Sequence, residues 1–261
     1  MKARVMWAIL PVLVIGGCLF RRGGPREPEP VETVDTTQRR ADSLYQVGAV
    51  HFRAGKWNDA IFALDRALLI MDYANPRRAR GYFMLAEAQF ASGSNLEAVR
   101  QFRRVADESS SDSLAADALL RAGDAYADLW RRPELDPSYG ETAVFTYSEV
   151  LERYPGTSAA QRAQMRIVEL QQLFAEKEYK TARFYLRYKA YDSAILVLRN
   201  LIATYPRAPI VPDALASLVD AYQKLDYQED VQDTCQYIRQ FFPQVIGRVE
   251  QCQGTAPPPP R

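Results

Sequence analysis

The segment Ala190–Pro206, AYDSAILVLRNLIATYP, decides the fold class. Ala194 is followed by apolar residues four and seven positions later, Leu198 and Leu201, and the segment ends in Tyr205-Pro206. Residues at this spacing form one stripe along a helix, and a small residue in the stripe lets the helix approach a neighbour closely. Proline cannot continue the helix because it lacks a backbone N–H donor. The segment therefore predicts one short, closely packed helix.

The same pattern recurs along the chain, and a second helix pattern precedes each copy. Repeated helix pairs at spacings somewhat above 34 residues are typical of tetratricopeptide repeats, with insertions between the units. We therefore predict an all-α fold, an α-solenoid of about five tetratricopeptide (TPR) helix pairs, in which the small residues serve packing alone. Those residues are Ala60, Ala98, Ala143, Ala194 and, in a degenerate copy, Val231.

The composition limits the classes of function. The 261-residue chain has a formal net charge of +1, one histidine and three cysteines. Because no strong basic field exists, nucleic acid is not an expected partner. The sequence contains no Gly-rich phosphate loop, no His-Glu-x-x-His and no Cys-x-x-Cys. We therefore expect a protein that is not an enzyme and has no cofactor, no metal site and no small-molecule substrate.

The first residues resemble a lipoprotein signal. Met1–Arg4 is positively charged, and Val5–Ile15 is an apolar run of the length found in secretory signals, too short for the roughly 20 residues that span a bilayer. It ends in Ile15-Gly16-Gly17-Cys18, which resembles the lipobox at which bacterial lipoproteins are cleaved and diacylated on the cysteine. We predict lipidation of Cys18. The alternative is an ordinary signal peptide or a signal anchor with an incidental cysteine.

The repeat pattern divides the chain into five segments. Ser158–Phe174 has a helical pattern but no partner of its own, so it either continues into the next helix or packs beside it. The predicted segments are a signal peptide at 1–17, a lipidated cysteine and flexible tether at 18–40, TPR units one to three at 41–155, a long helix with units four and five at 156–246, and a disordered Pro-rich tail at 247–261.

Several stretches carry a family resemblance. Leu135-Asp136-Pro137 precedes Ala143, Leu151–Ser158 contains Tyr-Pro-Gly-Thr, and Glu176–Tyr179 leads into a tyrosine-rich fourth unit that closes at Tyr205-Pro206. With the lipobox and the tether, these features resemble the BamD family of outer-membrane protein assembly lipoproteins. The resemblance covers about residues 40–243 and departs at the ends of the first two units, Met71–Pro76 and Asp107–Asp112. It implies a lipid-anchored protein on the periplasmic face of the outer membrane.

A stack of helix pairs exposes a concave face built from the first helix of each pair. Aromatic side chains on such a face are suited to bind an extended peptide. The resemblance implies that this peptide is the C-terminal aromatic strand of an unfolded outer-membrane protein. The alternative is that some of the rings pack between helices. Counting from the repeat consensus gives seven candidate peptide-binding residues, Tyr45, Phe52, Arg53, Phe83, Glu87, Phe90 and Leu120, with Asp124 and Asp128 on the same face.

The same counting exposes Tyr179, Arg183 and Arg187 in unit four, facing Asp213 and Asp220 in unit five. One interpretation is a solvated or internally paired charged face, in which each exposed ion pair contributes about 0–1 kcal/mol. The other is a docking surface. The resemblance implies that a barrel-type (BamA-like) insertase docks on the C-terminal repeats, so these five residues are the candidate partner-binding set.

Two cysteines remain once Cys18 carries a lipid. Cys235 and Cys252 would lie in an oxidising compartment, where two leftover cysteines can form a disulfide. Cys235 also takes a core-facing position in the last helix, where a buried free thiol is common. Both alternatives stay open at this point.

The sequence thus favours a non-catalytic scaffold of the outer-membrane β-barrel assembly machinery that binds unfolded outer-membrane proteins and an insertase. The alternative function is a periplasmic TPR accessory protein that coordinates cell-wall remodelling or division.

Overall fold

The structure, a computed structural model, describes residues 34–253. These residues form helices joined by short turns, and none of them lies in a β-strand. The helices are α1 Val34–Arg53, α2 Trp57–Ile70, α3 Arg78–Ala91, α4 Asn95–Glu108, α5 Asp112–Asp128, α6 Ser138–Arg153, α7 Ser158–Arg187, α8 Tyr191–Thr204, α9 Val211–Lys224, α10 Gln228–Phe241 and the 3-10 helices η1 Pro243–Arg248 and η2 Glu250–Cys252.

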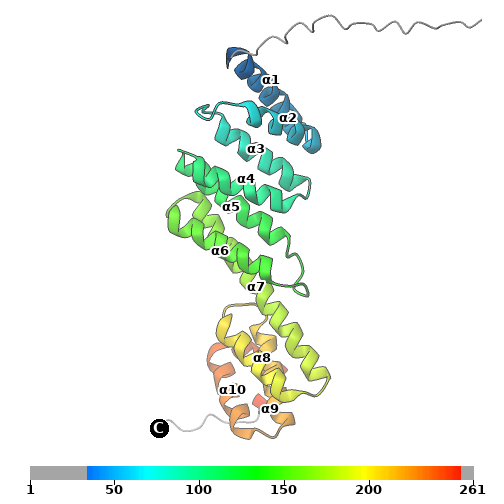
Figure 1. Cartoon of the computed structure of the whole chain (residues 1–261). Coiled ribbons are helices and arrows are strands. Elements are labelled where there is room, and N and C mark those ends of the chain that lie inside the picture. Colours follow the sequence, from blue (N-terminus) through cyan, green and yellow to red (C-terminus); the bar gives the residue numbers. More distant parts are fainter. Residues whose placement is uncertain (1–33, 254–261) are drawn as a thin grey trace, which may run out of the picture.

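The ten α-helices stack as five pairs. Each helix packs mainly on the helices before and after it in the chain, from α1 through α10. Figure 1 shows the resulting elongated stack, with α1 at one end and α9 and α10 at the other. The all-α solenoid of five TPR pairs that the sequence predicts is confirmed.

Close contacts between paired helices depend on small residues from both members. The repeat alanines Ala60, Ala98, Ala143 and Ala194 are completely buried. Glycines supply the complementary small surface on the first helix of a pair. A Cβ added to Gly123 of α5 would lie 2.4 Å from Cε1 of Tyr147 on α6, well inside contact distance. The two helices can therefore approach only because position 123 has no side chain.

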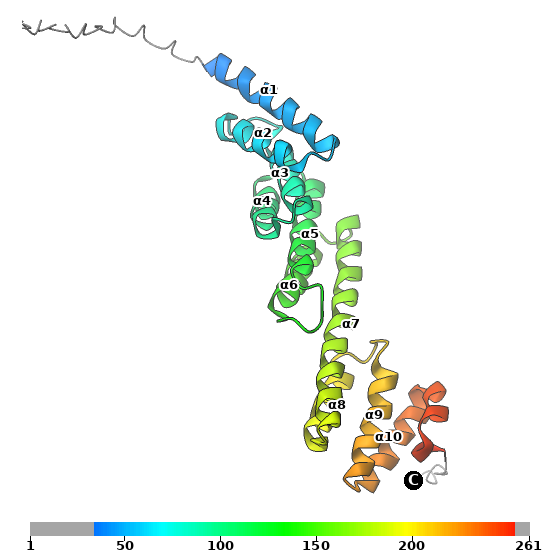
Figure 2. The ribbon, with the colours of Figure 1, turned by 90° about the vertical axis from the view of Figure 1, so that its right-hand side faces the viewer.

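Helix α7 joins the two halves of the stack. The stretch Ser158–Phe174 continues without interruption into the first helix of unit four, which settles the alternative left open by the sequence. In Figure 2, α7 runs alongside α5 and α6 in its first part and alongside α8 in its second. One buried cluster extends from Ala41 to Leu170, and a second extends from Ala175 to Cys252.

The ends of the folded body differ from the predicted boundaries. Helix α1 begins at Val34, within the stretch expected to be a tether, because Ala41 and Tyr45 bury one face of the helix. Residues 247–253, expected in the tail, instead belong to η1, η2 and the turn that follows. The signal peptide, Cys18, the tether before residue 34 and the Pro-rich residues 254–261 lie outside the described residues.

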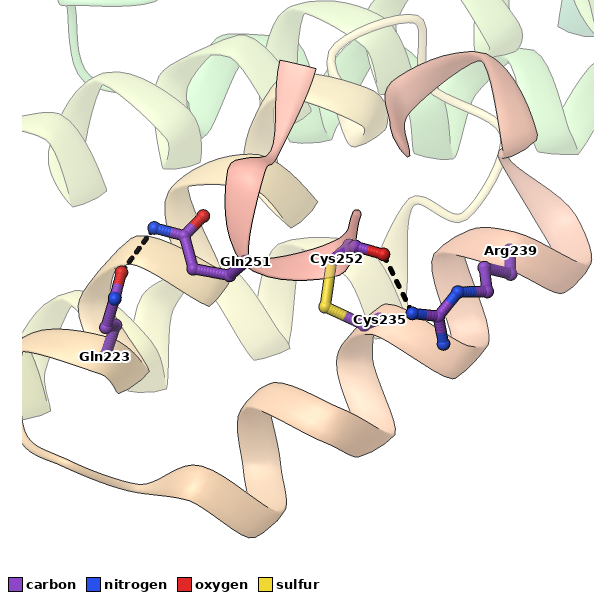
Figure 3. Close-up of a disulfide and its surroundings, with 5 residues drawn as sticks. All are labelled: Gln223, Cys235, Arg239, Gln251 and Cys252. Carbon is purple, nitrogen blue, oxygen red and sulfur yellow. Dashed lines mark hydrogen bonds between the residues drawn. A yellow bond between two sulfur atoms is a disulfide. The ribbon is translucent and has the colours of Figure 1, made fainter. Parts of the chain in front are cut away.

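A disulfide between Cys235 and Cys252 fastens η2 to α10. Figure 3 shows Arg239 donating a hydrogen bond to the carbonyl oxygen of Cys252 over 2.8 Å, and Gln251 bonded to Gln223 of α9. Val245 of η1 and Val249, between η1 and η2, are buried as well. The segment thus covers the apolar end of the last helix pair, as terminal repeats of a solenoid require.

The close approach of α5 and α6 can be tested with Gly123→Ala. Alanine is intrinsically better than glycine in a helix, but its Cβ would displace the ring of Tyr147. We expect a loss of about 1–3 kcal/mol in the free energy of unfolding, typical of overpacking. Chemical denaturation followed by circular dichroism measures it. Gly247→Ala is the control, since nothing lies within 4 Å of the added Cβ; equal stability of both variants would contradict this packing.

Candidate peptide groove and docking surface

Three of the predicted peptide-binding residues meet in one cavity. Phe52 and Arg53 of α1 and Phe83 of α3 line a space of about 780 Å³, which also reaches Leu114 on α5. We call this space the first cavity. Its walls come from the first helices of units one to three and from the Ser109–Ser111 turn that precedes α5. The first helices of these units therefore share an open groove.

The first cavity combines aromatic surface with positive charge. The ring of Phe83 packs edge-on against Phe102, with 5.6 Å between centroids, and Phe52 packs in the same way on Trp57. Arg53 and Arg80 lie at the rim, and within residues 34–253 neither has a carboxylate partner. The first turn of α5 also lines this space, and there the Ser111 hydroxyl caps the helix by accepting a hydrogen bond from the backbone N–H of Leu114.

A second cavity of about 500 Å³ lies further along α3 and α5, beside α7. Phe90 of α3, Arg121 of α5 and Trp130 line it. Two hydrogen bonds hold Arg121 to Glu87, from Nε to Oε1 at 2.6 Å and from Nη2 to Oε2 at 2.8 Å. The guanidinium carbon lies 4.7 Å from the centroid of the Phe90 ring. Glu87, one of the predicted residues, thus orients an arginine of the groove.

Charges in the second cavity are strongly coupled. Burial alone would lower the pKa of Arg121, but hydrogen bonds and charge from Glu87 and Asp124 outweigh it and raise that pKa. Burial, reinforced by Asp124, also raises the pKa of the Tyr147 hydroxyl, which donates to Asp124 over 2.8 Å. Arg121 therefore stays charged and Tyr147 stays neutral at any physiological pH.

Two predicted groove residues lie elsewhere. Tyr45 is 8% exposed and Leu120 is 2% exposed, so both belong to the core and the groove position expected for them is wrong. The ring of Tyr45 fills the space beside Gly81, where its Cε2 would lie 3.4 Å from an added Cβ. Helix α5 is covered by α4, α6 and also α7, which leaves little of its surface free for Leu120.

The predicted C-terminal set does not form one paired face. Arg183 and Arg187 are exposed on α7. The Tyr179 hydroxyl lies 3.1 Å from Oγ of Ser217, and Asp213 forms an ion pair with Arg248 of the terminal segment. Asp220 is accessible to solvent, and the protein around its carboxyl group removes enough water to raise its pKa. Among the described residues, the structure records no ion pair between either arginine and either aspartate.

The structure adds residues that repeat counting missed. Phe184 and Tyr188 are 49% and 66% exposed, and their ring centroids are 4.7 Å apart at the end of α7. Arg187 lies over both rings, at 5.9 and 5.5 Å. An i, i+4 pair of aromatic residues flanked by arginine is the sequence signal that could have found this patch. Arg80 and Arg121 in the groove were also missed.

A third cavity of about 630 Å³ lies between helices of the C-terminal half. Its lining comes from α8, α9 and α10 and includes Ile202, Leu218 and Tyr222, with Asp230 and Asp233 at its acidic side. The sequence pattern did not single it out.

The described residues show neither a membrane span nor a metal site. Every helix between residues 34 and 253 is too short or too polar to cross a bilayer. Over the same range, His, Cys, Asp and Glu side chains nowhere gather in threes in a way that could hold a metal ion.

Comparison with known proteins identifies sequence relatives. The BamD outer membrane protein assembly factor of Vibrio cholerae is 32% identical over 108 residues, which span 41% of this chain and 45% of the relative. That of Caulobacter vibrioides is 24% identical over 236 residues, 90% of this chain and 75% of the relative. The match to the Vibrio cholerae protein thus covers less than half of the length of that relative.

Among solved structures, the TPR2AB domain of yeast Sti1 in its pHSP90 complex is similar over 82% of this chain and 83% of its own, with 17% identity and a TM-score of 0.44. The family model YfiO, described as "Outer membrane lipoprotein", matches residues 37–237, which include parts of all five helix pairs. This chain belongs to the YfiO family of outer membrane lipoproteins, which includes the BamD assembly factors.

Proposed function

We propose that this protein is a lipid-anchored periplasmic scaffold of the outer-membrane β-barrel assembly machinery. Family membership and relatives named as outer membrane protein assembly factors support this role. The observation that carries the proposal is the first cavity, where Phe52, Phe83 and two arginines without carboxylate partners face one open groove. A scaffold without catalytic groups can act on a protein only by binding it, and this groove is suited to do so.

The chemistry of the first cavity fits one kind of peptide. Its apolar lining can take the aromatic side chain at the end of an unfolded β-strand. Arg53 and Arg80 can receive the terminal carboxylate, since charged N–H donors form strong hydrogen bonds with an anion. The second cavity extends the groove for preceding residues, with Phe90 stacked under Arg121. The ligand is therefore an unfolded outer-membrane protein that ends in an aromatic residue.

The exposed end of α7 is the proposed docking surface for a barrel-type insertase. Arg183 and Arg187 flank Phe184 and Tyr188, so the surface offers two large rings beside positive charge. Aromatic and arginine side chains dominate the binding energy of protein interfaces. Tyr179 and Asp213 contribute indirectly, because each is already bonded within the C-terminal half.

The carboxylate contact predicts the effect of replacing both arginines of the first cavity. Arg53→Gln with Arg80→Gln should weaken binding of a labelled peptide ending in phenylalanine roughly tenfold, or about 1.4 kcal/mol. Fluorescence anisotropy measures the affinity, and Arg66→Gln on the far side of α2 is the control. Amidation of the peptide should weaken wild-type binding similarly and leave the double variant unaffected. Equal affinities for both peptides in the wild-type protein would contradict the carboxylate site.

The proposed docking surface predicts that insertase binding can be lost while peptide binding remains. Arg183→Glu with Arg187→Glu places negative charge beside the two rings, so co-purification of a barrel-type insertase from the native host should fall sharply. Peptide affinity should stay unchanged, because the first cavity lies in the other half. Arg66→Glu, which adds negative charge in the N-terminal half, is the control. If the wild-type protein instead recovers a peptidoglycan enzyme and no insertase, the assembly role is wrong.

The lipid anchor predicts the location of the protein. Cys18→Ala removes the thiol that would be acylated, so the variant should move from the outer-membrane fraction to the soluble periplasmic fraction. Immunoblotting of separated fractions measures this shift. A Cys18→Ala variant that stays with the membrane would show that another element anchors the chain.

A further inference from the structure

The two halves of the solenoid have little direct contact. In a repeat stack each unit touches only its neighbours, and here the first buried cluster ends at Leu170 while the second begins at Ala175. Helix α7 passes between them as a single element (Figure 2). Long helices are rarely straight and curve gently over their length, so α7 alone does not fix the relative orientation of the halves as firmly as contacts between them would.

The loop between α5 and α6 reaches across this junction. It spans residues 129–137, and its Trp130 is almost completely buried. The indole stacks on Phe174 of α7 with 4.5 Å between centroids, and Phe174 stacks on Tyr205 at the end of α8 at 6.4 Å. Three aligned rings thus connect a loop of the N-terminal half with a turn of the C-terminal half.

Polar contacts hold the same loop to the second part of α7. Lys177 Nζ donates to the carbonyl oxygens of Pro133 at 3.1 Å and Leu135 at 3.0 Å. Trp130 Nε1 also donates to the Leu135 oxygen, at 3.3 Å. Lys180, one turn further along α7, forms an ion pair with Glu134. The loop carbonyls therefore accept hydrogen bonds from a helix of unit four.

Gly140 leaves room for the indole of Trp130. A Cβ added to Gly140, in the first turn of α6, would lie 2.2 Å from Cε3 of Trp130. Only glycine leaves room for the ring at this point. Trp130 also forms part of the wall of the second cavity. One side chain therefore contacts both the proposed groove and the junction.

We propose that the 129–137 loop is a brace that fixes the orientation of the C-terminal half relative to the groove, through the Trp130–Phe174–Tyr205 stack and the lysine contacts. The brace holds the groove and the exposed end of α7 at a constant separation. It acts by positioning, since none of its residues needs to touch a partner. The inference concerns the unliganded chain and does not depend on which peptide or insertase binds.

The distance between the halves tests the brace directly. Spin labels carried by unnatural amino acids at positions 100 and 200, exposed on α4 and α8, leave the native cysteines untouched. Pulsed dipolar spectroscopy should give a narrow distance distribution for the wild-type chain. Lys177→Met with Lys180→Met removes the polar contacts, and Phe174→Leu breaks the ring stack. Each variant should broaden or shift the distribution.

Controls separate the brace from general unfolding. Lys56→Met, at an exposed lysine far from the junction, should keep the wild-type distribution. Circular dichroism should show wild-type helix content in every variant that is compared. Broadening in either brace variant supports the proposal and identifies the contact that carries it. Wild-type distributions in both brace variants, or a broad distribution in the wild-type chain itself, would overturn it.

Discussion

The contact between small residues of paired helices is the constraint on which the structure depends. The completely buried repeat alanines bring the second helix of each pair against its neighbours, and Gly123 lets Tyr147 press directly on the backbone of α5. Close approach fixes which face of each helix points inward. Every other feature follows from that orientation, including the groove on the first helices and the exposed end of α7.

The stack departs from a regular solenoid between the units that form the groove and the units that form the proposed docking surface. Units one to three carry the groove, and units four and five carry the exposed arginines and rings. Between them, the long α5–α6 loop and the extended α7 replace an ordinary repeat boundary. A uniform array would distribute bending over all its interfaces. This chain instead concentrates extra contacts, aromatic and polar, at the one junction between its two halves.

Much of the fold could be predicted from the sequence because the spacing of small and apolar residues in each repeat indicates which face of the helix is buried. Ala194 with Leu198 and Leu201 predicts a buried stripe, and Tyr205-Pro206 predicts its end; both agree with α8. The C-terminal cap was missed because Val245 and Val249 give only one apolar pair at helical spacing, shortly before the proline run 257–260. The start of α1 was missed because its first turns are mostly polar and only Ala41 and Tyr45 reveal an inward face.

The candidate site was harder to predict than the fold. Counting from a consensus assumes ideal units, and it placed Tyr45 and Leu120 in the groove. Both side chains are instead buried in the core: Tyr45 packs beside Gly81, and Leu120 lies on α5, which α7 helps to cover. Phe52, Arg53 and Phe83 do line the first cavity, and their role in peptide binding stays a prediction. Trp130 had no repeat position at all, since it belongs to an insertion. Its role depends on a tertiary contact with Phe174.

The groove, and not the outer surface, is the proposed binding site for unfolded outer-membrane proteins. Site-specific photo-crosslinking in living cells tests it most directly, with the photoreactive amino acid at position 83 in the first cavity or at position 69, exposed on the outer side of α2. The account predicts adducts with newly exported β-barrel proteins from position 83 and few from position 69. Adducts from position 69 alone, or from neither position while assembly proceeds, would contradict it.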